Sequence, residues 1–317
     1  MNIITLTINP ALDKSAYVDG LVATQKLKCH SIEYQPGGGG INVSRVLGRL
    51  GQKTHCLFTS GGDTGKYLND LLHKEGVTTE AIPVKGWTRE NLSVVDTRTN
   101  LQYRFGMPGS KLEKIELEAT KSLVDRLLKP GDMLVLSGSL PEETPTDYYA
   151  QLIKLVSPKK IKVVIDTSGP ALLKSLKEKV FLLKPNQKEL AHLAGKDYLS
   201  RTEQEDCALK MIQSKKAEYI IVSLGAGGAF LASKEGVFYQ ANPSISPKST
   251  IGAGDSMVAG LIYALTKHFS LPEILKWGVA CGAATTMRTG TALADKTDIT
   301  KVLQMIDHAS DEFNSIL

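Results

Sequence analysis

Short runs of apolar and β-branched residues alternate with amphipathic stretches along most of this chain. The intervening segments, such as INVSRVLGRLG, DYYAQLIKLV and KELAHLAG, carry apolar residues at helical spacing. Strands that alternate with helices form a largely parallel sheet, because each helix carries the chain back to begin the next parallel strand. We therefore predict an α/β fold with helices on both faces of the sheet. The expected strands are 3–8, 54–59, 132–138, 162–167, 180–185 and 219–225.

Two stretches break this alternation. Residues 14–35 and 89–105 have the alternating pattern of strands, but no helix lies within them. A parallel α/β core does not need them, so we expect them to form one small β-sheet that projects as a lid or dimer surface. With flanking residues, the lid spans about 14–35 and 87–107. No Ser/Gly linker divides the 317 residues, which predicts a single domain, 1–317, with this lid.

The composition argues against several classes of protein. The net charge of +5 is not gathered into basic runs, which disfavours a nucleic-acid partner. The six histidines form no HExxH pattern and the four cysteines no CxxC pattern, so a zinc enzyme is not expected. No apolar run reaches the roughly 18 residues that a membrane span needs, and the first residues lack a signal-peptide pattern. These features predict a cytoplasmic protein with reduced thiols and no membrane partner.

Three glycine clusters suggest sites where a backbone approaches an anion: PGGGGIN (36–42), SLGAGGA (223–229) and IGAGD (251–255). None matches GxGxxG, which removes the main support for a nicotinamide-dependent dehydrogenase. The stretch SGGDTGKY (60–67) lacks the spacing and hydroxyl of a P-loop, and we expect a turn that opens a helix. The third cluster precedes a helix expected to begin near Asp255, where free amides favour an anion. Taken alone, Asp255 is either a helix cap or a functional acid.

Six motifs of the chain resemble the PfkB family of ribokinase-like sugar kinases, from residue 1 to about 310. The signatures PGGGGINVSRVLGRLG and STIGAGDSMVAG stand in the family's order, with NPALD, SGSLP, KPNQKEL and VSLGAGGA as further matches. The resemblance implies a ribokinase-like fold, with a mostly parallel Rossmann-like sheet and a β-sheet lid over the sugar. It also implies ATP bound near the C-terminal half and phosphoryl transfer to a primary hydroxyl.

Within the family, the chain is most similar to the minor-type ATP-dependent 6-phosphofructokinases, through WTRENL, QYRFGMPG and Gly39. This similarity implies that fructose 6-phosphate is converted to fructose 1,6-bisphosphate in glycolysis. The chain also resembles 1-phosphofructokinases and tagatose-6-phosphate kinases, in which a lysine usually stands at the position of Gly39, and these activities are alternatives. A non-catalytic sugar-binding relative is a more remote alternative, against which the presence of Asp255, Asn186 and Glu189 argues.

The resemblance implies a role for each matched position. Asp255 is the base for the attacking hydroxyl, and the amides of Gly252, Ala253 and Gly254 stabilise the charge on the transferred group. The sugar phosphate is expected against these residues: Asp13, Gly38, Gly39 and Asn42 at the sugar, and Lys26, Arg89, Ser139 and, as a weaker candidate, Arg104 at its phosphate. A loop-capping Asp, a tight turn and solvated lid residues are the corresponding structural alternatives.

The nucleotide and its ions are expected, on the same resemblance, in the C-terminal half. The nucleotide contacts are Lys184, Asn186, Ser223, Gly225, Gly227, Gly228 and Ala283. Mg²⁺ is held partly through water by Asn186 and Glu189, with Asp166 assisting, although an ordinary helix start and a structural Asp explain these residues too. Many relatives also hold a monovalent cation such as K⁺, here at Ser249, Ile251, Thr285 and Gly290. The lid predicts a homodimer, because apolar strand edges are a liability in a monomer.

Overall fold

The structure, a computed structural model, describes residues 1–316. In this part of the chain a nine-stranded sheet has the order β13-β12-β11-β10-β9-β8-β1-β4-β5. Neighbouring strands from β5 to β11 are parallel, whereas β12 and β13 are antiparallel. The strands are β1 (Ile3–Thr7), β4 (His55–Ser60), β5 (Thr79–Pro83), β8 (Met133–Ser137), β9 (Lys162–Asp166), β10 (Val180–Leu183), β11 (Ala217–Ser223), β12 (Ala229–Ser233) and β13 (Gly236–Gln240).

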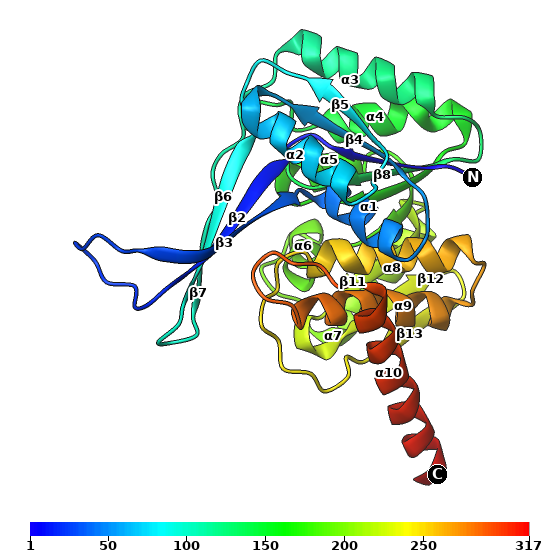
Figure 1. Ribbon diagram of the computed structural model, residues 1–317. Coiled ribbons are helices and arrows are strands. Elements are labelled where there is room, and N and C mark those ends of the chain that lie inside the picture. Colours follow the sequence, from blue (N-terminus) through cyan, green and yellow to red (C-terminus); the bar gives the residue numbers. More distant parts are fainter. Residues whose placement is uncertain (317) are drawn as a thin grey trace.

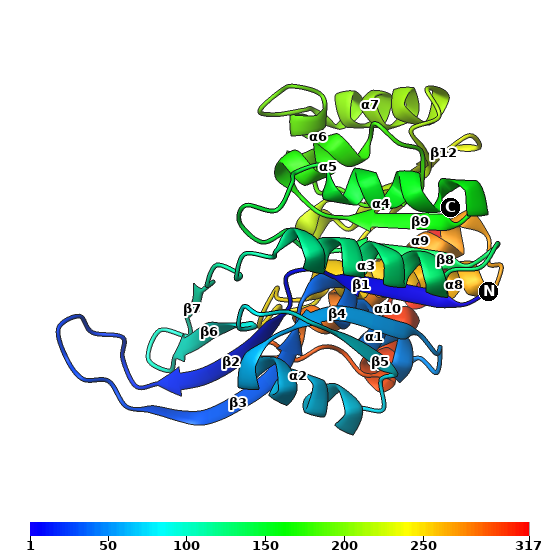
Figure 2. The same ribbon diagram turned by 90° about the horizontal axis from the view of Figure 1, so that it is seen from above.

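Helices cover both faces of this sheet (Figures 1 and 2). Successive strand residues point to opposite faces, so Leu134 and Leu136 belong to one core cluster and Met133 and Val135 to the other. The first cluster packs against α3 (Lys114–Leu127), α4 (Tyr148–Val156), α5 (Gly169–Ser175), α6 (Gln187–Leu193) and α7 (Arg201–Gln213). The second packs against α1 (Gly39–Arg49), α8 (Ala253–Thr266), α9 (Leu271–Thr286) and α10 (Lys296–Ile316).

The helix α2 (Gly62–Lys74) packs on a third, smaller cluster. Its Leu68 and Leu72 meet Phe58 of β4 and Ile41 of α1. Two short 3₁₀ helices, η1 (Ser157–Lys159) and η2 (Gly225–Gly227), complete the helical elements. No helix in residues 1–316 combines the length and the apolar composition needed to cross a membrane. The predicted α/β architecture with helices on both faces is confirmed.

A separate four-stranded sheet, the small sheet, projects from one side of the core (Figures 1 and 2). Its order is β3-β2-β6-β7, formed by β2 (Ala11–Val18), β3 (Cys29–Gly37), β6 (Arg89–Asp96) and β7 (Gln102–Phe105). The small sheet was predicted, but it begins at Ala11 rather than at residue 14. Only three residues, 8–10, separate β1 from β2, so Asp13 lies within a strand and not in a loop after β1.

Candidate active site

Two cavities open near the start of α8. One, of about 370 Å³, lies between the loop after β11, the loop after β13, the first turns of α8 and the last turns of α9. The other, of about 460 Å³, lies between the small sheet and the residues that precede α8. We refer to them as the glycine-lined cavity and the small-sheet cavity. Ala253 and Gly254 line the first cavity and Ile251 lines the second, so the turn before α8 borders both.

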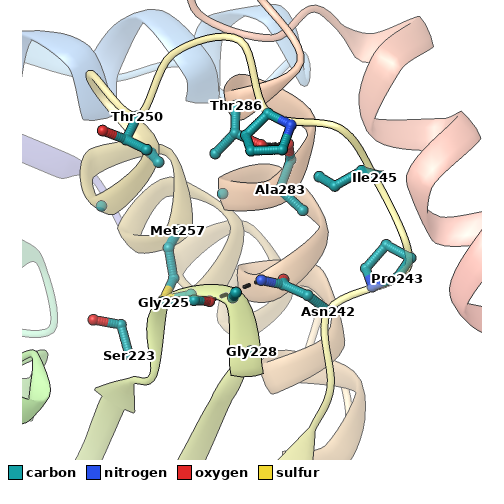
Figure 3. A pocket seen from close by; sticks show the side chains of 15 residues that line it. Ser223, Gly225, Gly228, Asn242, Pro243, Ile245, Thr250, Met257, Ala283 and Thr286 are labelled. Atoms are coloured by element: carbon teal, nitrogen blue, oxygen red, sulfur yellow. Dashed lines mark hydrogen bonds between the residues drawn. The ribbon is translucent and has the colours of Figure 1, made fainter.

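Backbone and small side chains form the glycine-lined cavity (Figure 3). Asn242 donates from Nδ2 to the carbonyl of Gly225 at 2.9 Å and thereby joins its two loops. Gly228 has φ +91°, and a Cβ there would lie 2.1 Å from the Gln240 carbonyl oxygen, so this turn requires glycine. Of the predicted nucleotide contacts, the lining includes Ser223, Gly225, Gly228 and Ala283; Ala226 lines the cavity where Gly227 was expected.

Charged side chains form the small-sheet cavity. Its lining includes Asp13 and Lys14 from β2, Arg89 from β6 and Arg104 from β7. Asn91 donates from Nδ2 to Oδ1 of Asp13 at 2.8 Å. Burial raises the pKa of Asp13, and the Asn91 hydrogen bond and nearby arginines oppose that rise. The cavity therefore presents one carboxyl group among several cations, a composition suited to a ligand with both hydroxyl and anionic groups.

Asn9 connects two of the predicted phosphate contacts. It donates from Nδ2 to Oγ of Ser139 at 3.1 Å, and its carbonyl accepts from Nη2 of Arg89 at 3.2 Å. Arg89 also donates to the Met107 carbonyl at 2.9 Å, which holds its guanidinium against the small sheet. Asn9 was not among the predicted site residues, although the NPALD motif contains it.

Lys26 does not join these residues within one chain. It is exposed and lies in the loop between β2 and β3, at the far tip of the small sheet (Figure 1). It lines neither the small-sheet cavity nor the glycine-lined cavity. The expectation that Lys26 faces the same cavity as Arg89 is therefore wrong for a single chain, because the strands of the small sheet carry the loop away from the core.

The N-terminal turn of α1 packs very closely on the core. A Cβ on Gly38, which has φ +119°, would lie 2.7 Å from Cγ2 of Thr7. A Cβ on Gly39 would lie 2.2 Å from Oγ of Ser137 and 2.7 Å from the amide nitrogen of Gly138. These glycines let α1 begin against the ends of β1 and β8, which brings Asn42 to the start of α8.

The helix α8 begins at Ala253, two residues earlier than expected, with Gly252 as its N-cap at φ +73°. Asp255 lies in the first turn, and its Oδ2 accepts from Nδ2 of Asn42 at 2.9 Å. The hydrogen bond that the structure gives Asp255 thus reaches across to α1. Asp255 lines neither cavity, but Gly254 lines one and Ile251 the other, and its place in the first turn of α8 puts it at the positive end of the helix dipole.

The pKa of Asp255 is raised well above its ordinary value. Burial, followed by repulsion from Asp166, raises the pKa of Asp255 to about 7, while the Asn42 hydrogen bond and the charge of Lys184 act in the opposite direction. Lys184 is 5% exposed and forms an ion pair with Oδ1 of Asp166 at 3.1 Å. Burial alone would lower the pKa of Lys184, but Asp166 raises it, with smaller contributions from Glu189 and Asp255. Lys184 and Asp166 therefore lie close enough to Asp255 to influence its charge.

Asn186 and Glu189 cap α6 reciprocally. Oδ1 of Asn186 accepts from the Glu189 amide at 2.9 Å, and Oε2 of Glu189 accepts from the Asn186 amide at 2.8 Å. The ordinary helix start considered above is therefore real. Burial raises the pKa of Glu189, the hydrogen bond from the Asn186 amide opposes this rise, and repulsion from Asp166 adds to it. Carboxylate oxygens suit Mg²⁺, which keeps much of its water shell, so these residues fit that ion.

The predicted cation ligands fall into two groups. Oγ of Ser249 donates to the Gly290 carbonyl at 2.7 Å and accepts from the Ile251 amide at 3.3 Å, so three of the four lie together. Oγ1 of Thr285 is instead occupied in the packing of α9, with Oγ of Ser256 at 2.8 Å and the Ala294 amide at 3.1 Å. The Thr285 side chain therefore holds helices together.

Comparison with known proteins finds relatives that match most of the chain. The model of the pfkB family carbohydrate kinases matches residues 7–298. The ATP-dependent 6-phosphofructokinase isozyme 2 of Escherichia coli is 37% identical over 303 residues, 95% of this chain and 98% of that protein. The 1-phosphofructokinase of Bacillus subtilis is 34% identical over 284 residues, 89% of this chain and 92% of that protein.

Solved structures show the same similarity. A crystal structure of phosphofructokinase-2 from Escherichia coli in complex with substrates and products has a TM-score of 0.93 at 36% identity, covering 97% of this chain and 100% of that chain. Ribokinase from Arabidopsis thaliana, at 17% identity, shares the fold with a TM-score of 0.71 over 96% of this chain and 98% of that chain. The family resemblance is confirmed, and the chain belongs to the pfkB family of carbohydrate kinases.

Proposed function

We propose that this protein is an ATP-dependent sugar-phosphate kinase that converts fructose 6-phosphate to fructose 1,6-bisphosphate. One observation carries the proposal: a glycine-lined cavity and a cationic cavity border the same turn, and Asp255 follows that turn. A phosphoryl donor in the first cavity and a hydroxyl acceptor in the second would then meet at a carboxyl group whose pKa lies near 7. Relatives whose names include 6-phosphofructokinase support the same reaction.

ATP fits the glycine-lined cavity. Met257 and Ala283 offer apolar surface for a base, while the turns at Gly225 and Gly228 expose backbone groups. Lys184 lies close to the first turn of α8, since a Cβ on Gly254 would be 3.5 Å from its Nζ. A buried cation and the first amides of α8 would then lie beside the phosphates. Asp166 and Glu189 would hold Mg²⁺ through water, and the ion when bound supplies charge neutralisation for the phosphates.

The sugar phosphate fits the small-sheet cavity. Asp13 and Asn42 offer hydrogen-bonding groups for sugar hydroxyls at the end nearer Asp255. Arg89 and Arg104, with Ser139 behind Asn9, offer donors for the phosphate that the substrate already carries. An unphosphorylated sugar would lack the anionic group that these cations would bind.

The reaction needs one proton acceptor and one site for developing negative charge. Ionised Asp255 takes the proton of the attacking hydroxyl as its oxygen forms a bond to the γ-phosphorus and the bond to the leaving ADP oxygen breaks. The amides of Gly252, Ala253 and Gly254 stabilise the charge on the phosphoryl group in transit. A base with a pKa near the working pH is well matched to this task.

The surroundings of Gly39 favour fructose 6-phosphate over the substrates of the other groups. A side chain at position 39 would collide with Ser137 and the backbone of Gly138, on the loop that carries Ser139. The lysine usual in 1-phosphofructokinases and tagatose-6-phosphate kinases thus requires another course for this loop. A 1-phosphofructokinase at 34% identity and a tagatose-6-phosphate kinase at 32% identity are among the relatives, so these two activities are the second candidates for this protein.

The small sheet is proposed to act as a lid of a single domain and to join two copies in a homodimer. Ile32 and Phe105 are 52% and 44% exposed on it, as an apolar contact surface requires. In such a dimer, Lys26 at the tip would serve the cavity of the second copy.

K⁺ is proposed to bind near the Ser249, Ile251 and Gly290 cluster, and one structure of the Escherichia coli relative is a complex with potassium. The four free cysteines suit a cytoplasmic location.

The test is a coupled ADP-release assay with fructose 6-phosphate, fructose 1-phosphate, tagatose 6-phosphate and fructose. We expect the highest kcat/KM with fructose 6-phosphate and at least about a hundredfold lower value with fructose, because fructose lacks the phosphate that Arg89 and Arg104 would bind. A higher kcat/KM with fructose 1-phosphate or tagatose 6-phosphate would show that the proposed substrate is wrong, while the proposed phosphoryl transfer to a sugar phosphate would stand. Preference for fructose would contradict the role of the small-sheet cavity.

A further inference from the structure

Arg45 is a buried cation one turn after Asn42 on α1, and it is 2% exposed. Its guanidinium binds Glu75 at the end of α2 through two contacts, Nε to Oε2 at 2.9 Å and Nη2 to Oε1 at 2.7 Å. Nη1 donates to the Pro36 carbonyl of β3 at 2.8 Å. Burial favours the protonated form of Glu75, but the hydrogen bonds and charges of Arg45 and Arg49 hold its pKa below the usual value. The guanidinium is therefore fixed by three elements.

A hydrogen-bonded chain leads from this guanidinium to Asp255. Nη1 of Arg45 also donates to Oδ1 of Asn42 at 3.4 Å, and Nδ2 of Asn42 donates to Oδ2 of Asp255 at 2.9 Å. A guanidinium has only donors and an ionised carboxylate only acceptors. If the Asn42 amide turned over, its NH₂ group would face the guanidinium and its oxygen would face the carboxylate, and both hydrogen bonds would be lost. Both hydrogen bonds, the one from Arg45 and the one to Asp255, therefore require the same orientation of the Asn42 amide.

We propose that Arg45 is a positioning residue for phosphoryl transfer, which holds the Asn42 amide in the orientation that donates to Asp255. This inference rests on the proposed role of Asp255 as the base. Without Arg45, Asn42 can rotate, and Asp255 loses the donor that both places its carboxylate and favours its ionised form. Three other charged groups act on the pKa of Asp255. They are Asp166 at the end of β9, Lys184 just after β10, and Asp13 in β2. None of them is removed by a change at Arg45.

The experiment compares two variants that differ in the Arg45 to Asn42 contact. In Arg45→Met/Glu75→Met both charges are removed together, so that neither is left buried alone. In Glu75→Gln the guanidinium stays in place beside Asn42. We expect the double variant to lower kcat about 10- to 50-fold with KM for ATP within about threefold, and Glu75→Gln to stay within about threefold of the unmodified protein. Similar losses in both variants would overturn the proposal.

A second comparison separates positioning from packing. If Arg45 acts through Asn42, the double change should lower kcat by less than about twofold when it is added to Asn42→Leu, since there is no amide left to orient. The rising limb of kcat/KM with pH should also move to higher pH in Arg45→Met/Glu75→Met. If the double change lowers kcat equally with Asn42 and with Leu at position 42, and the rising limb of kcat/KM with pH does not move, then Arg45 only supports the fold. Should the double variant not fold, Arg45→Lys carries the same expectations, because lysine keeps the charge without the planar fork.

Absence of turnover in the unmodified protein would contradict the proposed function, and a measurement without turnover then decides the role of Arg45. In protein labelled with ¹⁵N-asparagine, the side-chain amide signal of Asn42 is identified by its loss in Asn42→Leu. We expect this signal to follow the titration of Asp255 in the unmodified protein and to stop doing so in Arg45→Met/Glu75→Met. The same pH response in both proteins would overturn the proposal.

Discussion

The two cavities that border the start of α8 are built from different materials. Glycines, alanines and apolar side chains such as Ile245 and Met257 form the glycine-lined cavity, whereas the charged side chains of Asp13, Lys14, Arg89 and Arg104 line the small-sheet cavity. A ligand in the first is recognised mainly by shape and by main-chain donors, and a ligand in the second by charge. Substitutions should therefore affect the two ligands separately, except at Asp255, which follows the turn that borders both cavities and is the proposed base.

The largest effect is expected at this shared position. Asp255→Asn keeps the size of the side chain and its contact with Asn42 but removes the proton acceptor, so kcat should fall by roughly 10² to 10⁴. KM for both substrates should change much less, because neither cavity loses a lining group. Steady-state kinetics with both substrates measure the two quantities. Turnover within about tenfold of the unmodified protein would remove Asp255 from the role of base.

Thermal unfolding provides the control for this variant. The pKa of Asp255 is raised in the folded state, so its ionised form weakens the fold at pH values above about 7 and not below about pH 4, where folded and unfolded states are both protonated. Asp255→Asn should accordingly have a Tm equal to or above that of the unmodified protein at pH 8. A large drop in Tm would mean that lost stability, rather than lost chemistry, explains the kinetics.

Arg89 should give the next largest effect, confined to the small-sheet cavity. Arg89→Ala removes charge-assisted hydrogen bonds to the sugar phosphate, so KM for that substrate should rise about 10- to 100-fold while KM for ATP stays nearly constant. Arg126→Ala, a matched loss of charge on the exposed face of α3, serves as the control. Equal changes in both KM values would show that Arg89 acts on the structure of the site as a whole.

A substitution in the glycine-lined cavity should raise KM for ATP and not KM for the sugar phosphate, and the rise should be smaller than that expected for Arg89→Ala. Ala283→Leu adds bulk to its wall, and we expect KM for ATP to rise about tenfold with KM for the sugar phosphate nearly unchanged. Competition by an ATP analogue, measured by calorimetry, checks that binding and not turnover has changed. A rise in the sugar-phosphate KM alone would place the nucleotide elsewhere.

Much of this architecture could be predicted from local sequence patterns. Six of the buried core strands are predicted by runs of β-branched and apolar residues, and the small sheet stands out because no helix lies between its strands. The edge strands β5 and β13 were not predicted, since TEAIP and GVFYQ are short, partly exposed and mixed in polarity. Edge strands bury little apolar surface, so their sequences carry a weaker pattern.

The site was predictable in its membership but not in its connections. Motifs named Asn42 and Asp255, yet the hydrogen bond between them joins residues 213 positions apart and depends on how closely Gly38 and Gly39 let α1 approach β1 and β8. Arg45 carries no motif role that local patterns reveal, because its partners lie on three different elements. The family resemblance groups Lys26 with Arg89 at the sugar phosphate, and sequence could not show that Lys26 lies in the loop between β2 and β3 while Arg89 begins β6.

The pH dependence of kcat/KM for fructose 6-phosphate tests the central claim, that Asp255 is the base at the junction of the two cavities, most directly. This quantity reports the free enzyme, in which the pKa of Asp255 is raised to about 7. We predict a tenfold rise per pH unit below about pH 7, a plateau above it, and loss of this limb in Asp255→Asn. A profile that stays flat between pH 5.5 and 8.5, or a limb that persists in Asp255→Asn, would contradict the account.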